Sequence, residues 1–339
     1  VLKRDDHFRI EPINKSRIDA VSGPFFLGMD RKREYFEQRH AGYHSFFKQD
    51  WVNLPGFIEK KAEKILKDSG QSFDLVGDYL WPVATATSIK FFGVKAANEE
   101  DFKEAIRAVF HETFLNLGND TKVREKGEEG GKALTSWTRA EIRKIRKSGK
   151  LGDDFLGVLL QAMTEKSDEE ITYISSGYLV DSIDTTVTTA TNILYEFVSN
   201  AAVLNSVKND IDNDRRFVGW MMEALRRRPH NPIILRQAAR DTKIGEKSVK
   251  KGAQIFAITL SAMQDSAAFT NPKELIPTRQ FDRYMHFGYG VHACAGRDLN
   301  FVQLPILVKA ILKRNPISIG NISFVGPFPG SVKITLGET

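Results

Sequence analysis

The chain has 339 residues, of which 41% are apolar and 27% charged, and its formal net charge at pH 7 is +6. No apolar run reaches the roughly 18 residues that a membrane-spanning helix needs, so the sequence excludes such a span in this chain. The single cysteine excludes an internal disulfide and is typical of a protein of the reducing cytoplasm.

Apolar residues recur at the helical spacing along most of the chain, while short alternating runs are confined to its second half. Ser72 is the expected N-cap of the helix that follows it. The predicted helices are 31–48, 54–68, 73–91, 98–115, 130–148, 153–164, 168–199, 216–228 and 297–313. The predicted strands are 232–238, 242–249, 253–258 and a hairpin within 322–336.

Basic residues cluster at 60–67, 139–147 and 226–228. Such clusters can bind nucleic acid, but the interleaved aromatic residues of a single-strand binder are absent, so solvated helix faces are the favoured interpretation. No linker, repeat or low-complexity segment divides the sequence. We therefore expect one domain over residues 1–339 and no nucleic-acid partner.

The only cysteine, Cys294, lies in a glycine-rich turn at 287–296, just ahead of an apolar helix. A lone cysteine is commonly an inert buried residue or a nucleophile. Here His292 supplies a donor nearby, and the N-terminus of the following helix favours negative charge. These features are typical of a stabilised thiolate. The turn depends on three glycines, Gly288, Gly290 and Gly296.

The pattern FxxGxxxCxG, which begins at Phe287, resembles the heme-binding loop of the cytochrome P-450 family. The resemblance implies that Cys294 is the axial thiolate of heme b (iron protoporphyrin IX), a ligand that favours cleavage of the O–O bond. It also implies a mainly α fold, a helix-rich triangular prism with a small β-rich lobe. Family members usually carry a further stretch before the part that begins here, so an N-terminal part is expected to be absent from this chain. The loop residues assigned to the cofactor are Phe287, Gly288, Gly290, His292, Cys294 and Gly296.

Three further motifs of the same family stand upstream in the expected order. Glu223-Ala224-Leu225-Arg226 matches ExxR, whose charges face each other three residues apart on a helix; alone, such a pair is usually exposed. The stretch 236–241 is similar to the strand RxAxxD, and the resemblance makes Arg236 a ligand of a heme propionate. Arg279, in a segment similar to FxPxRF, is expected to complete the Glu223–Arg226 network.

A second propionate ligand is expected in the helix at 31–48. The family places a tryptophan or histidine four residues before an arginine there. Tyr35 and Arg39 have that spacing, with tyrosine as the unusual member, and Arg33 is the competing candidate. We expect His292, Arg236 and Arg39 to hold the heme carboxylates.

The oxygen-handling residues are expected in one long helix over 171–199. Asp184 and Thr185 stand where the family has the acid–alcohol pair of its AGxDT sequence, which delivers protons for oxygen activation. Asp181 and Ser182 replace the usual alanine and glycine. An aspartate is costly near an apolar pocket unless paired or hydrated, so Asp181 is either a catalytic acid–base group or a residue on a solvent-facing helix side.

Three functions remain open. The first is a heme-thiolate monooxygenase that takes electrons from a ferredoxin or reductase and hydroxylates a small apolar substrate, for which Phe110, Phe114 and Ile233 are candidate contacts. The second is a peroxygenase or fatty-acid hydroperoxide isomerase that needs no electron donor. It is suggested by likeness of 25–30, 114–120 and 326–329 to P-450 domains fused to fatty-acid dioxygenases. The third, a non-catalytic heme sensor, has no use for Asp184 and Thr185. The monooxygenase is the favoured hypothesis.

Overall fold

The computed structural model describes residues 1–48 and 51–337. The chain divides into two compact units, each assembled from separate stretches of sequence. The first contains Val1–Leu54, Thr85–Asp184 and Leu235–Ile255, and the second contains Pro55–Ala84, Thr185–Ile234 and Phe256–Thr339. The prediction of a single domain over 1–339 stays a prediction.

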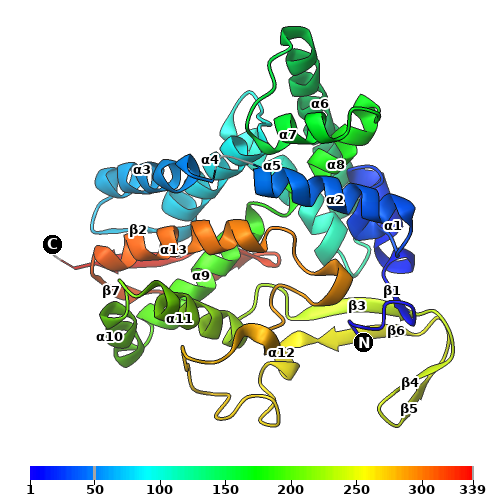
Figure 1. The fold of residues 1–339 in the computed structure, drawn as a ribbon. Helices are drawn as coiled ribbons and strands as arrows, with labels where there is room; N and C mark the ends of the chain where they lie inside the picture. The colour runs from blue at the N-terminus through cyan, green and yellow to red at the C-terminus, as the bar shows by residue number, and fades with distance from the viewer. Residues whose placement is uncertain (49–50, 338–339) are drawn as a thin grey trace. The chain divides into compact units, whose positions relative to one another are not determined.

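The first unit is built mainly from helices, with α5 packed on α6, α2 on α7, and α6 on α8 (Figure 1). Its helices are α1 (Glu11–Val21), α2 (Arg33–Lys48), α5 (Glu99–Phe110), α6 (Thr121–Ser148), α7 (Phe155–Ala162) and α8 (Asp168–Val180). A π-helical turn, His111–Leu115, extends α5. Strands β1 (Phe8–Arg9), β3 (Ile233–Ala238) and β6 (Gln254–Ile258) form a sheet of order β1-β3-β6. Strand β4 (Thr242–Ile244) pairs with β5 (Lys247–Val249).

Aromatic rings form the centre of this unit. Phe46 lies 5.1 Å from Phe91, 5.3 Å from Phe155 and 5.5 Å from Tyr178, measured between ring centroids. Their tilted and edge-on arrangements are those that the ring quadrupole favours. Gly42 is required here, because a Cβ at that position would lie 2.1 Å from the Tyr178 ring. The cluster thereby fixes α2 against α7 and α8.

The second unit contains the remaining helices and the C-terminal strands. Its helices are α3 (Asn53–Asp68), α9 (Asp184–Val198), α10 (Ala201–Asn209), α11 (Asp214–Arg227), α12 (Thr259–Ala262) and α13 (Arg297–Lys313), and α4 (Trp81–Phe92) begins in it. Strands β2 (Ser72–Asp74), β10 (Lys333–Leu336) and β7 (Pro316–Ile319) form an antiparallel sheet, and β8 (Ser323–Val325) pairs with β9 (Phe328–Ser331).

Most predicted helices are confirmed, but the prediction for 73–91 is wrong at its start. Ser72 and Phe73 lie in β2, opposite Thr335 and Ile334 of β10. The helical conformation begins after Asp74, whose carboxylate accepts hydrogen bonds from the Val76 and Val332 amides. Pairing with a strand some 260 residues away overrides the local preference, because it satisfies backbone groups that the helix would leave exposed. Helices α1, α10 and α12 (Thr259–Ala262) were not predicted.

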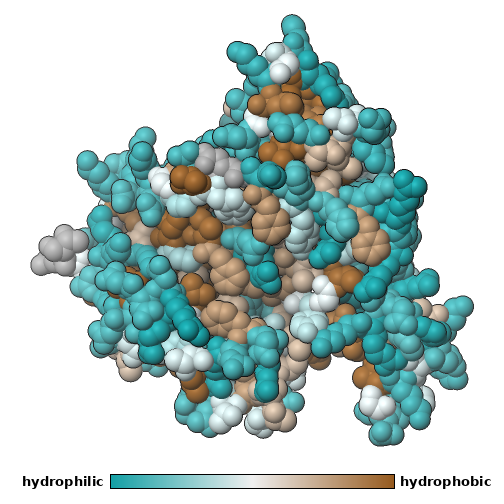
Figure 2. All heavy atoms as spheres, viewed as in Figure 1, coloured by the Kyte–Doolittle hydropathy of each residue, from teal (hydrophilic) through white to brown (hydrophobic). Residues whose placement is uncertain are grey.

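Hydrophilic side chains dominate the face shown in Figure 2, with apolar patches between them. Among the helices of residues 1–48 and 51–337, none is long and apolar enough to cross a membrane.

Candidate active site

The turn that carries Cys294 is held by its own backbone. The Cys294 amide donates to the Phe287 carbonyl at 2.8 Å, and the Ala293 amide donates to the Gly290 carbonyl at 3.1 Å. Gly288 and Gly290 have φ values of 71° and 78°, in the region that only glycine enters readily. The expected need for glycine at these two positions is therefore confirmed.

Gly296 behaves differently from the other two glycines. Its φ is −81°, so any residue could adopt its backbone conformation. A Cβ built there would lie 3.9 Å from the Cys294 Sγ, which shows how close the sulfur comes to this residue. Gly296 is also the residue that precedes the first turn of α13. The exposed Cys294 sulfur thus lies beside a helix N-terminus, where backbone amides favour a thiolate.

Arg236, in the first unit, carries a buried positive charge. Its side chain is 5% exposed, and its Nη1 donates to the Leu235 carbonyl at 2.7 Å. Within the described chain no carboxylate forms an ion pair with it. Burial lowers the pKa of Arg236, and the more distant Asp30 and Asp5 offset this only in part. A buried guanidinium of this kind fits a carboxylate group such as a heme propionate.

Arg39 is the better of the two candidates on α2. Its Nε is buried and has no hydrogen-bond partner among residues 1–48 and 51–337, and its guanidinium stacks 4.7 Å from the Tyr43 ring centroid. Tyr35, one turn before it, is fully buried. Arg33 instead forms an exposed ion pair with Glu37 at 2.6 Å. The competing assignment of Arg33 thus loses its support.

The donors fit heme by their chemistry. An exposed cysteine sulfur at a helix N-terminus suits a soft, thiolate-binding metal, and the two arginines suit ionised propionates. Cys294 and His292 belong to the second unit, whereas Arg236 and Arg39 belong to the first. Their joint role as heme ligands remains a prediction.

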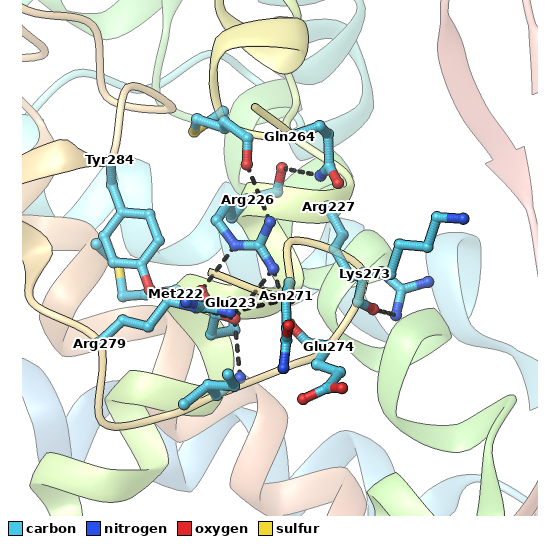
Figure 3. Close-up of polar contacts among 12 residues, drawn as sticks. Met222, Glu223, Arg226, Arg227, Gln264, Asn271, Lys273, Glu274, Arg279 and Tyr284 are labelled. Atoms are coloured by element: carbon cyan, nitrogen blue, oxygen red, sulfur yellow. Dashed lines mark hydrogen bonds and ion pairs between the residues drawn. The ribbon is translucent and has the colours of Figure 1, made fainter. Parts of the chain in front are cut away.

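The predicted Glu223–Arg226–Arg279 network is confirmed (Figure 3). Glu223 accepts from Arg226 Nε at 2.8 Å and Nη2 at 3.1 Å, and from Arg279 Nε at 3.2 Å. Two further guanidinium N–H groups of Arg226 donate to the Met263 and Glu274 carbonyls, each at 2.9 Å. Both members of the ExxR pair are fully buried, so this is a structural ion pair and not a surface one.

The network has one member that the sequence did not reveal. The Tyr284 hydroxyl donates to Glu223 Oε1 at 2.6 Å, next to the ring of Phe269. Burial alone would raise the pKa of Glu223, but hydrogen bonds from Arg226, Tyr284 and the Ile276 amide outweigh it and hold the pKa below its usual value. Because Tyr284 lies two residues before His286 and three before Phe287, the network also anchors the segment that leads into the cysteine turn.

The long helix expected over 168–199 is interrupted. Helix α8 ends at Val180 and α9 begins at Asp184, with Asp181, Ser182 and Ile183 between them. The Ser182 amide and hydroxyl both donate to the Leu179 carbonyl, at 3.0 and 2.7 Å, in place of a regular helical bond. A serine that bonds its own backbone competes with the helix, and this signal was present in the sequence.

Both acidic residues at this break, Asp181 and Asp184, have a raised pKa. Burial raises the pKa of Asp181 to about 7. Burial also raises the pKa of Asp184 to about 7, against the opposing effect of Arg107. Arg107 on α5 reaches Asp184 Oδ1 at 3.1 Å, while Asp184 Oδ2 has no hydrogen-bond partner in the described part of the chain. The role of Arg107 was missed, since nothing in a sequence links positions 77 residues apart.

A family model described as Cytochrome P450 matches residues 90–319, more than half of the chain. The chain is 28% identical to cytochrome P-450 YjiB of Bacillus subtilis over 77% of its own length and 66% of that protein's. It is 30% identical to a bifunctional dioxygenase–epoxy alcohol synthase of Fusarium oxysporum over 38% of its length and 10% of that protein's. The chain thus spans about two thirds of the length of its bacterial relative.

The fold is also that of solved P-450 structures. The crystal structure of P450BioI in complex with an acyl carrier protein ligated to hexadec-9Z-enoic acid has a TM-score of 0.86 at 18% identity, covering 99% of this chain and 89% of that one. This likeness confirms the mainly α fold with small sheets. Together with the match of the family model over residues 90–319, it shows that the chain belongs to the cytochrome P-450 family, whose cofactor is heme.

Proposed function

We propose that the chain is a heme-thiolate monooxygenase that uses dioxygen and two electrons from a ferredoxin or reductase to hydroxylate a small apolar substrate. The observation that carries this proposal is the acid–alcohol pair at the start of α9, where Asp184 is buried beside Arg107 and precedes Thr185. When bound through Cys294, heme supplies the chemistry of oxygen activation. Cys294, His292, Arg236 and Arg39 would hold it.

The described residues suit proton delivery. Arg107 Nε donates a hydrogen bond to Asp184 Oδ1, so Oδ2 is the oxygen that can hold a proton. Because the pKa of Asp184 lies at about 7, this oxygen can take up and release a proton near neutral pH. The neighbouring Thr185 hydroxyl can pass that proton on. Arg107 also fixes the carboxylate at the first residue of α9.

An apolar substrate agrees with the aromatic residues at the end of α5. Phe110 is 4% exposed, and its ring lies 5.2 Å from that of Phe114. Phe114 belongs to the π-helical turn His111–Leu115, a form of helix that is common at functional sites. Ile233, on β3, belongs to the second unit and stays a separate candidate.

Thr185→Ala is the experiment that tests the oxidant. In a monooxygenase the variant should keep consuming electrons while product falls and hydrogen peroxide rises, because the proton no longer arrives in time. Electron-donor consumption, product and peroxide would be measured together. Thr191→Val is the control, since the Thr191 hydroxyl donates to the Val187 carbonyl of its own helix. Donor-free turnover with hydrogen peroxide or a lipid hydroperoxide that survives Thr185→Ala would contradict the proposal.

Asp181 supports a second candidate function, a peroxygenase or hydroperoxide isomerase. Its carboxyl stands at the helix break, and burial raises its pKa to about 7, which suits an acid–base group. The similarity over 38% of the chain to the Fusarium dioxygenase–epoxy alcohol synthase points the same way. Such an enzyme would turn over a hydroperoxide without an electron donor.

Asp181→Asn should change how stability depends on pH. Because the pKa of Asp181 is raised in the folded chain, the folded state holds a proton between about pH 4 and pH 7 that the unfolded state releases. The free energy of unfolding therefore falls as pH rises through this window. Removing the carboxyl should flatten the fall by up to about 1.4 kcal/mol per pH unit. Urea unfolding at pH 4 to 8 measures the slope, with Asp282→Asn, at an exposed position, as control. Equal slopes for Asp181→Asn and the wild-type protein would contradict the raised pKa of Asp181.

Arg236→Leu should speed the loss of heme by roughly 10-fold or more, because a charge-assisted hydrogen bond to a propionate is lost. Transfer of heme to an excess of apomyoglobin gives the rate. Arg240→Leu is the matched control on the same segment, since Arg240 is exposed and pairs with Asp6 at 2.6 Å. Equal rates for the two variants would remove Arg236 from the site.

A further inference from the structure

A chain of polar side chains joins the first two turns of α13 to the first turn of α9 within the second unit. The Asn300 side-chain amide donates to the Gly296 carbonyl at 3.2 Å. Gln303 Nε2 donates to Asn300 Oδ1 at 3.1 Å and to Thr186 Oγ1 at 2.8 Å. We call Asn300, Gln303 and Thr186 the amide bridge.

Two residues of the bridge, Gln303 and Thr186, are buried, and Asn300 is half-buried. Gln303 is 3% exposed and Thr186 is 1% exposed. A primary amide has two N–H donors, and Gln303 uses one on each side of the bridge. Replacing it with an apolar residue would remove the N–H donated to the buried Thr186 hydroxyl and to the half-buried Asn300 side chain, and the loss of a hydrogen bond to a buried polar group is costly.

Pro305 weakens the connection between the first two turns of α13 and the rest of that helix, so hydrogen bonds from outside the helix matter there. It lies inside the helix, two residues after Gln303, and it has no N–H to donate to the carbonyl of Phe301. A proline inside a helix weakens its ladder and allows it to bend at that place. The first two turns of α13, which follow directly from the cysteine turn, are therefore less firmly held by the rest of the helix.

The two ends of the bridge adjoin the two residues to which the proposed function gives chemistry. Gly296 follows Cys294 by two residues, and Thr186 directly follows Thr185. We infer that Gln303 is a positioning residue that holds the turn of Cys294 and the start of α9 with Thr185 in one fixed register. This inference rests on the proposed function, because that function requires both residues at once.

The test is a double-mutant cycle with Gln303→Leu, Thr186→Val and the double variant, on the full-length, heme-containing protein. Each single variant should lower the ratio of product formed to electrons consumed by about 2- to 10-fold, the range set by one lost hydrogen bond. The double variant should be no worse than the poorer single variant, since both remove the same link. Thr191→Val serves as the buried-threonine control and should leave the ratio unchanged. Gln303→Glu keeps the size of the side chain but has no N–H to donate to Asn300 Oδ1, so it should lower the ratio as Gln303→Leu does.

A second measurement separates this inference from the proposed function. The midpoints of urea unfolding are measured for the four proteins of the cycle: wild type, Gln303→Leu, Thr186→Val and the double variant. These midpoints report on the bridge independently of the enzyme's activity. Effects of the two single variants that add up fully, in midpoint or in product ratio, would overturn the bridge. A non-additive midpoint with an unchanged product ratio would overturn the positioning role. If the wild-type protein shows no thiolate-ligated heme, the proposed function fails, and the midpoints alone still decide whether the bridge exists.

Discussion

Cys294→Ser should abolish the long-wavelength absorption band that the reduced protein forms with carbon monoxide and should reduce turnover to background. The chain has only one cysteine, so no other thiolate can take its place. Serine has nearly the same size as cysteine, but its hydroxyl stays protonated at neutral pH and cannot replace the thiolate ligand. The turn itself should survive, because the Phe287 and Gly290 carbonyls bond the backbone amides of Cys294 and Ala293 and not their side chains.

Cys294→His separates ligation from folding. Histidine can bind heme iron, so this variant should retain heme but show the spectrum of an imidazole ligand. Far-ultraviolet circular dichroism would confirm that both variants stay folded. A wild-type-like carbon monoxide band in Cys294→His would show that the thiolate ligand had been assigned to the wrong residue.

The cysteine turn could be predicted because its requirements are local. Gly288 and Gly290 adopt positive φ angles that restrict the residue type, and the sulfur lies within a few residues of the helix that follows. The ExxR pair is local in the same way, since Glu223 and Arg226 face each other across one helical turn. A fixed spacing is enough to recognise both.

The partners of these residues depend on distant parts of the chain, and most could not be predicted. Tyr284 reaches Glu223 from 61 positions away, and Arg107 reaches Asp184 from 77. Phe73 was predicted in a helix because its strand partner, Ile334, lies near the other end of the chain. The break at 181–183 was not predicted either, although Asp181 and Ser182 stood in the sequence as polar departures from the family pattern.

For the amide bridge, the sequence marks two of the residues as unusual but does not show their partner. Asn300 and Gln303 lie three residues apart on a helix that otherwise buries leucine, isoleucine and valine, which marks them as unusual. The sequence does not show that their partner is Thr186, 117 positions before Gln303. A polar residue on an apolar helix face thus indicates that a hydrogen-bond partner is present. The structure shows which residue that partner is.

Arg226→Ala should destabilise the protein by about 3–5 kcal/mol, the usual cost of removing one member of a buried ion pair. Glu223 would keep its bonds from Arg279, Tyr284 and the Ile276 amide, but the Met263 and Glu274 carbonyls would lose their donor. Since domains are stable by only about 5–15 kcal/mol, we expect little soluble, heme-containing protein.

Arg227→Ala is the matched control for this prediction. Arg227 is the next residue on α11. Its side chain is 40% exposed, forms an ion pair with Glu196 at 3.4 Å and donates to the Lys273 carbonyl at 3.1 Å. Its loss should cost no more than about 1 kcal/mol, as for other exposed ion pairs. Soluble yield, heme content and the urea midpoint would be compared for the two variants. If Arg226→Ala matched Arg227→Ala in all three, the buried network would not be what holds the segment leading to Cys294.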